Sequence, residues 1–127
     1  MLKTDGRNIE ITRGDWLPIE VTATDEVNNT PYAFQKGDVI RFKVFEKKNV
    51  TNIILSKDFK VETETESVFI DIPASDMKFG EFINKSVDYW YEIELNPDTD
   101  RASTIVGFTK ELGAPILTLS VEGGDKK

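Results

Sequence analysis

Hydrophobic and polar residues alternate with a period of two in short runs along most of the chain. In an extended strand every second side chain lies on the same face, so this alternation predicts strands with one buried and one solvent-facing side. Clusters of Gly, Asn, Asp and Pro separate the runs, and helical periodicity is nearly absent. The predicted strands are Arg7–Thr12, Trp16–Ala23, Val39–Glu46, Ile53–Val61, Ser67–Ile72, Val87–Leu95, Ser103–Thr109 and Ala114–Val121.

The connections between these runs favour one architecture. Only the segment 73–78 could form a helical turn, and no connection is long enough for the crossover helix that a parallel pair of neighbouring strands requires. About eight short strands with such connections are typical of antiparallel pairing in two packed sheets. We therefore expect an all-β protein, an antiparallel β-sandwich of about eight strands with one short helical turn.

The amino-acid composition excludes several classes of catalytic site, metal site and partner. The chain has 127 residues, 16 Lys plus Arg, 23 Asp plus Glu, a formal net charge of −7, and neither His nor Cys. Imidazole and thiol catalysis and zinc sites of the usual N/S type are therefore excluded. A negative chain with dispersed basic residues also argues against nucleic acid and anionic membranes as partners, because both require concentrated Lys and Arg.

The ends of the chain carry no targeting signal that we recognise. The polar start Met1–Asp5 lacks the apolar stretch of a signal peptide, and the longest apolar runs are too short to span a bilayer. We expect synthesis in the cytoplasm without secretion, and no membrane segment. One domain at 1–122 and a flexible C-terminal tail at 123–127 account for the whole chain.

Three polar motifs suggest chemistry, and each has a simpler explanation. Arg13–Asp15 spells a cell-adhesion tripeptide, but a Gly-Asp turn between strands accounts for it. Asn96, Asp98 and Asp100 alternate as calcium ligands do, but Pro97 stiffens the run and no distal bidentate Glu follows, which favours a bare turn. We expect no metal and no cofactor.

A carboxylate pair on the strand Val87–Leu95, the third of these motifs, offers the one route to catalysis. Glu92 and Glu94 lie on the same face, about 7 Å apart, which is within the range that glycosidases use. Alternating acidic residues are usually the solvated side of a strand, so the chain is predicted not to be an enzyme. A hydrolase built on this pair remains the third hypothesis.

Aromatic residues on the polar faces of strands are the candidate contacts for a partner protein. Trp16, Phe45 and Trp90 each fall on the face that the alternation assigns to solvent. Such a side chain is either covered by other parts of the fold or left as an anchor for a partner. Exposed rings could instead stack on sugars, and Trp90 with Tyr32 would serve a carbohydrate-binding module, which is the alternative function.

Three segments carry a family resemblance. They are Arg13–Asp15 with its following strand to Thr24-Asp25 and then Gly37–Val44, next Ile72–Asp76 leading into Tyr89–Leu95, and last Thr104–Phe108. In this order they resemble the small immunoglobulin-like sandwich at the N-terminus of phage baseplate upper proteins and of related tail proteins of Firmicutes phages and prophages. The resemblance implies an immunoglobulin-like sandwich and supplies no catalytic residues.

In that family the module docks a longer polypeptide onto the tail tip, and the part that follows contacts the host receptor. Here the sequence stops at Lys127 without a coiled coil or second domain. The resemblance therefore implies a phage or prophage virion structural protein, a tail or baseplate component or an adaptor. We expect it to form a homo-oligomer and to contact other phage structural proteins within the virion.

Overall fold

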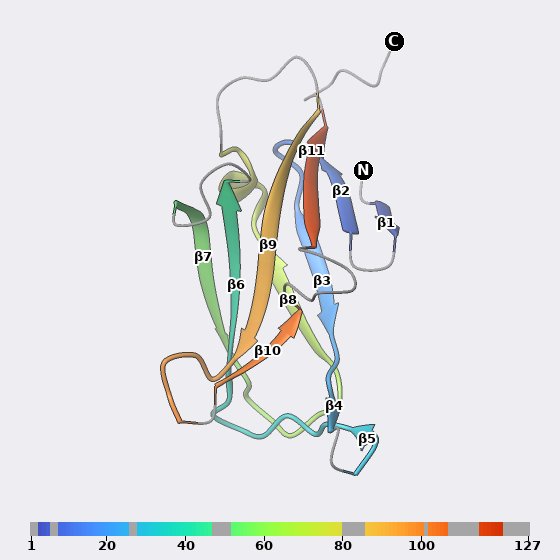
Figure 1. Cartoon of the computed structure of the whole chain (residues 1–127), viewed down its shortest axis with the longest axis vertical. Helices are drawn as coiled ribbons and strands as arrows, with labels where there is room; N and C mark the ends of the chain where they lie inside the picture. The colour runs from blue at the N-terminus through green and yellow to red at the C-terminus, as the bar shows by residue number, and fades with distance from the viewer. Residues whose placement is uncertain are drawn as a thin grey trace.

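The computed structural model describes residues 3–5, 8–25, 28–46, 52–79, 86–100, 102–106 and 115–120 (Figure 1). These residues form strands and one 3₁₀ helix, which confirms the predicted all-β class. The elements are β1 (Lys3–Asp5), β2 (Asn8–Thr12), β3 (Leu17–Val21), β4 (Thr24–Asp25), β5 (Thr30–Pro31), β6 (Val39–Glu46), β7 (Ile53–Lys60), β8 (Val68–Ile72), η1 (Ala74–Met77), β9 (Val87–Leu95), β10 (Ser103–Val106) and β11 (Ile116–Ser120).

The larger sheet has the strand order β1-β2-β11-β9-β6-β7. One edge of β9 pairs with β6 along its length, and the other edge pairs first with β11 and then with β10. Among the described strands all pairs are antiparallel except β2 with β11, which is parallel. The prediction of antiparallel pairing is wrong for this pair, because β2 and β11 come from opposite ends of the chain and no hairpin joins them.

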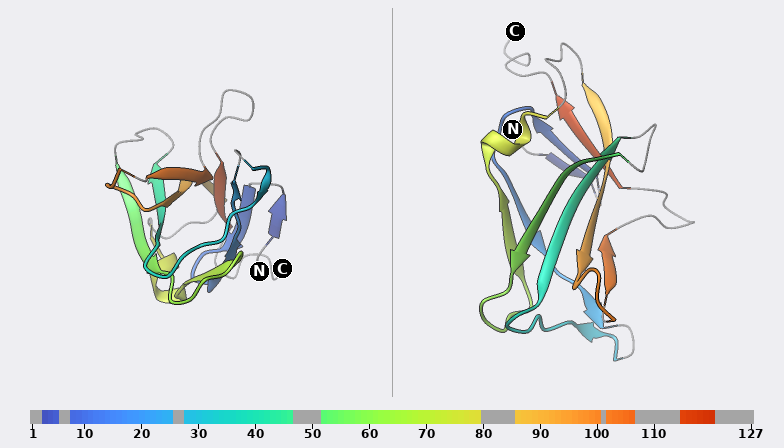
Figure 2. Two further views of the ribbon diagram at one scale, coloured as in Figure 1. Left: turned by 90° about the horizontal axis from the view of Figure 1, so that it is seen from below. Right: turned by 90° about the vertical axis from the view of Figure 1, so that its left-hand side faces the viewer.

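A smaller sheet of two antiparallel strands, β3 and β8, packs against the larger one. In Figure 1 β8 passes behind β9 and β3 lies to the right of β9, and Figure 2 shows the molecule from below and from the side. The two-residue strands β4 and β5 form a separate ribbon at one end, within a stretch that the sequence pattern assigned to a loop.

The inward faces of both sheets form one hydrophobic core, as the alternation predicts. The side chains of Leu17 and Ile72 lie opposite each other on the smaller sheet and are fully buried. The larger sheet contributes the alternate residues of its strands, such as Phe42 and Tyr91, whose rings are in contact with centroids 5.8 Å apart. Every second residue of these strands consequently faces outward.

The predicted helical turn is confirmed at Ala74–Met77, as a single 3₁₀ turn that buries Met77. Pro73 precedes it without any side-chain cap, and the last turn hydrogen-bonds to the chain before β3, where the Gly14 amide donates to the Met77 carbonyl over 2.9 Å. This contact fixes the start of β3 against the end of β8. The predicted tail at 123–127 lies outside the described residues.

A β-bulge changes the face of one predicted core residue. The register of β6 and β7 shifts between Val44 and Phe45, so that Val44 lies opposite Leu55 but Phe45 lies opposite Ile53. Strict alternation along the predicted strand Ile53–Val61 places Ile53 on the inner face with Leu55, and the structure shows that this is wrong. The extra residue, Ile54, moves Ile53 to the outer face, where it is 49% exposed.

Candidate functional site

The outer face of the larger sheet carries a row of apolar side chains across four strands. Trp90 on β9 lies opposite Phe45 on β6 and opposite Ile116 on β11. Phe45 lies in turn opposite Ile53 on β7. Directly opposed side chains on one face are in contact range, so these four residues, which we call the outer row, form a continuous strip. Phe45, Trp90 and Ile116 are half-buried, and Ile53 is exposed.

Ion pairs cover the outer face next to this row. The Lys43 ammonium lies 3.0 Å from Glu94 and 3.5 Å from Glu92, and 5.6 Å from the centre of the Phe45 ring. Partial burial lowers the pKa of Lys43, but the hydrogen bond and negative charge of Glu94, with those of Glu92, outweigh it and raise that pKa above its ordinary value. The two carboxylates are thus charge partners of one lysine, and a hydrolytic pair has no support from their surroundings.

A second ion-pair cluster lies further along the same face. The Arg41 guanidinium donates two hydrogen bonds to Asp58, over 2.7 and 3.1 Å, and one to Asp98 over 3.0 Å. The bonds from Arg41 hold the pKa of the Asp58 carboxyl below its ordinary value, although desolvation acts in the opposite direction. The outer face of the larger sheet therefore carries the outer row and, beside it, two clusters of cross-strand ion pairs centred on Lys43 and Arg41.

The turn after β9 is the position of the calcium site that was weighed from the sequence. Two of the side chains that would be its ligands form hydrogen bonds within the protein instead. Asn96 accepts a hydrogen bond from the Val39 amide over 2.9 Å, and Asp98 binds Arg41. Asn96 and Asp98 both adopt positive φ, which suits Asn and Asp in tight turns. Across the described ranges, no group of three or more His, Cys, Asp or Glu side chains could hold a metal ion.

A buried carboxylate holds the start of β6 to this turn. Asp38 is only 5% exposed. Its carboxylate accepts hydrogen bonds from the Tyr32 hydroxyl (3.0 Å), the Gln35 backbone amide (2.9 Å) and the Asn96 side-chain amide (3.2 Å). Tyr32 thereby belongs to a structural network, and its ring packs edge-on against Phe34.

This network separates the two rings of the carbohydrate-binding alternative. Tyr32 binds Asp38, which directly precedes Val39 at the start of β6, whereas Trp90 lies opposite Phe45 near the end of that strand. The positions Val39 and Phe45 are about 20 Å apart along the strand. Tyr32 and Trp90 do not form one sugar platform.

The outer face of the smaller sheet carries the two most exposed aromatic residues of the part of the chain that the structure describes. Trp16 is 58% exposed and Phe69 is 68% exposed. The Trp16 indole N–H donates to the Asp71 carboxylate over 3.2 Å, which places the ring over the outer side of β8. Pro18 lies opposite Asp71, two residues after Trp16 in the chain. We call Trp16, Pro18 and Phe69 the small-sheet patch.

The cell-adhesion tripeptide lies in the turn that leads into this sheet. The Arg13 side chain donates to the carbonyls of Lys78 and Phe79. The Asp15 amide closes the turn by donating to the Thr12 carbonyl over 3.0 Å, and Gly14 between them has a φ of 90°, a conformation that glycine adopts without strain. The tripeptide therefore shapes the entry to β3.

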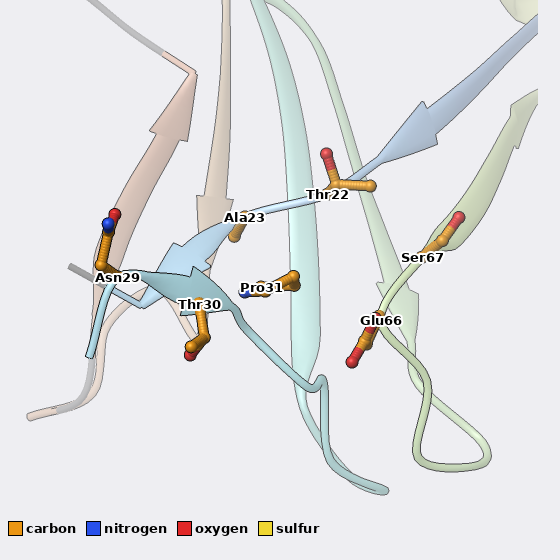
Figure 3. Close-up of a pocket in the computed structure, with 7 residues that line it drawn as sticks. All are labelled: Thr22, Ala23, Asn29, Thr30, Pro31, Glu66 and Ser67. Atoms are coloured by element: carbon orange, nitrogen blue, oxygen red, sulfur yellow. The ribbon is translucent and has the colours of Figure 1, made fainter. Parts of the chain in front are cut away.

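A pocket of about 510 Å³ opens beside the other end of the smaller sheet. Figure 3 shows Glu66 and Ser67, which precede β8, on one side and the β4–β5 ribbon on the other. Its lining residues are Thr22, Ala23, Asn29, Thr30, Pro31, Glu66 and Ser67. Glu66 is the single ionisable group among them, so this lining holds no acid–base pair.

The structure brings together two of the three predicted contact residues and separates the third. Phe45 and Trp90 are direct cross-strand neighbours, whereas Trp16 lies on the other sheet. Sequence reasoning missed Phe69, although the same rule finds it, because Phe69 is the apolar residue on the polar side of β8. It also missed Ile53, whose face depends on the bulge.

Comparison of the chain with known protein families, curated proteins and solved structures finds no match. In the part of the chain that the structure describes, no helix has the length and apolar character needed to cross a membrane.

Proposed function

We propose that this chain is a structural protein of a phage or prophage virion, a tail or baseplate component or adaptor that acts by contact with other proteins. The outer row carries this proposal. Exposed or half-exposed aromatic and aliphatic side chains that form a strip across several strands are typical anchors at protein interfaces. The row reaches β7, which among the described strands is an edge strand of the larger sheet, and edge strands can pair with a strand of another protein.

The strand order supports the immunoglobulin-like part of the resemblance. In an immunoglobulin-like sandwich the strands G, F and C form one sheet, with C′ added in the variable type, and the strands B and E lie in the other. The order β11-β9-β6-β7, opposite β3 and β8, corresponds to G-F-C-C′ opposite B-E. The Firmicutes phage assignment rests on the sequence resemblance, and the chain would be made in the host cytoplasm without secretion.

Particle composition tests this function most directly. Phage or induced prophage particles from the source culture are purified on a density gradient, and their peptides are identified by mass spectrometry. We expect peptides of this chain in the particle fraction at a fixed ratio to other tail proteins. If the chain is found only in gradient fractions that contain no particles, the proposal is contradicted.

Solution mass tests whether the outer row joins copies of the chain. Light scattering across a concentration series should give a defined oligomer, ring-like or trimeric. Ile53→Thr should shift that oligomer to lower mass, because it removes the exposed apolar end of the row. Ser56→Thr is the matched control, since Ser56 is an exposed outward-facing residue of the same strand. A monomer at all concentrations contradicts the homo-oligomer, and binding to a glycan array would favour the carbohydrate-binding alternative.

A further inference from the structure

The chain segments that form the smaller sheet are acidic. The segments 14–35 and 61–77, which include β3, β8 and the β4–β5 ribbon, contain no Lys or Arg. Their acidic residues include Glu20, Glu66 and Asp71, all exposed at or beside the outer face of the sheet. On the larger sheet, in contrast, Lys43 and Arg41 pair with the carboxylates of the outer face.

These carboxylates frame the small-sheet patch. Asp71 accepts the Trp16 indole N–H, and Glu20 lies directly opposite Phe69. Glu20 also accepts a hydrogen bond from Ser67, which lines the pocket of Figure 3. The exposed rings, the carboxylates and the pocket therefore form one continuous surface from the start of β3 to the end of the sheet.

We propose that this surface binds an arginine-containing segment of another protein. A guanidinium stacks on aromatic rings and forms charge-assisted hydrogen bonds with carboxylates. The rings of the small-sheet patch and the carboxylates of Asp71 and Glu20 beside them offer both groups. The pocket is large enough for a long side chain, and Glu66 is its single charged lining group, which selects a cation. A second copy of the chain is disfavoured as the occupant, because two such acidic surfaces would repel each other.

This inference rests on the proposed contact function and names the chemistry of one partner. It assigns to the smaller sheet a role distinct from that of the outer row. A protein with two different docking faces can bridge two neighbours, as an adaptor does.

Peptide binding tests the inference. The probe is a fluorescent peptide of alternating Arg and Thr, compared with matched Lys-Thr and Glu-Thr peptides by fluorescence anisotropy at low and at physiological salt. We expect the Arg peptide to bind more tightly than the Lys peptide and the Glu peptide not to bind. Equal affinity for the Arg and Lys peptides overturns the proposed stacking on the rings.

Two sets of variants locate the binding surface. Asp71→Asn combined with Glu66→Gln should weaken binding of the Arg peptide about tenfold, since both charges border the surface. The amide oxygen that Asp71→Asn introduces can still accept the hydrogen bond from Trp16, so the ring keeps its place. Glu10→Gln combined with Asp100→Asn changes the net charge equally at exposed positions elsewhere. A similar loss in this control overturns the inference, because binding would then follow net charge alone.

Phe69→Thr separates the aromatic contribution from charge. Thr keeps the strand propensity of the exposed position, so the fold should persist, which circular dichroism and urea unfolding verify. We expect this variant to lose the preference for Arg over Lys. If Phe69→Thr leaves the preference for Arg over Lys unchanged, the ring does not stack on an arginine, and the inference is overturned. If the variant lowers the mass of the protein in solution, a second copy of the chain occupies this surface, and the inference is overturned as well. Particle composition is measured separately, so the proposed function can fail or hold independently of this result.

Discussion

The two sheets expose aromatic residues on their outer faces to very different degrees. Trp90 and Phe45 are half-buried on the larger sheet, whereas Trp16 and Phe69 on the smaller sheet are mostly exposed. The difference follows from the number of neighbouring strands. Trp90 has opposed side chains on both sides, from β6 and from β11, whereas β3 and β8 pair only with each other among the described strands.

Charge follows the same division. On the outer face of the larger sheet, Arg41 and Lys43 form cross-strand ion pairs with Asp58 and Glu94. The strands β3 and β8 contain no Lys or Arg, so no cross-strand ion pair forms between them. An apolar residue on the solvent side of a strand therefore has different consequences in the two sheets.

The largest expected difference in the free energy of unfolding is between substitutions on the two faces of β8. Ile72→Ala should lower the free energy of unfolding by about 2–5 kcal/mol, because it leaves a cavity in the core. Phe69→Ala on the adjacent outer side should cost about 1 kcal/mol or less, the range of strand propensity at an exposed position. Urea unfolding of both variants measures the difference. Equal losses would mean that Phe69 is covered.

The next contrast compares the two tryptophans. Trp90→Ala should lower the free energy of unfolding by about 2 kcal/mol, since half of a large ring loses its cover of neighbouring side chains. Trp16→Ala should cost less than about 1 kcal/mol, mainly through the hydrogen bond to Asp71. Thermal and urea unfolding should rank them in this order, and the reverse order would contradict the comparison of the two faces.

A smaller effect concerns pH and the ion pairs of the larger sheet. The folded pKa of Asp58 lies below the ordinary value of 3.8, so its pairing with Arg41 stabilises the fold fully above pH 3.8 and is lost as pH falls through the folded pKa. Asp58→Asn should therefore flatten the acid side of the stability curve. Urea unfolding between about pH 6 and pH 2 measures it, with exposed Glu62→Gln as the control. If the free energy of unfolding of Asp58→Asn falls with acid as steeply as that of the original chain, the pair of Asp58 and Arg41 does not contribute to stability.

The smallest expected effect on stability comes from variants that compare the solvent exposure of the two tryptophans. Trp90→Phe leaves Trp16 as the fluorophore, and Trp16→Phe leaves Trp90. Acrylamide should quench Trp16 more strongly than Trp90, because the Trp16 ring is more exposed. Equal quenching in the folded state would mean that the outer row is as open as the small-sheet patch.

Much of this fold could be predicted from the alternation alone. The pattern predicts Val87–Leu95 with its bounds and both faces, and it predicts β6 with the observed bounds. The short strands β4 and β5 escape prediction because two residues cannot display a period. The parallel pairing of β2 with β11 also escapes it, because pairing between distant segments leaves no local pattern.

The candidate sites could be predicted in part. Alternation places Trp16, Phe45 and Trp90 on outer faces, and all three lie there. It does not reveal that Phe45 and Trp90 are neighbours, since the register between β6 and β9 depends on the whole sheet. The bulge in β7 similarly moves Ile53 outward against its local pattern.

Local sequence dictates which side chains face the core and which face solvent, because that choice depends on a period of two within each strand. The assembled sheets set how far each outward aromatic is covered and which carboxylates have a cation beside them. Coverage and charge pairing depend on neighbouring strands, and those strands come from distant parts of the chain. The exposed patch of the smaller sheet is thus a property of the complete fold.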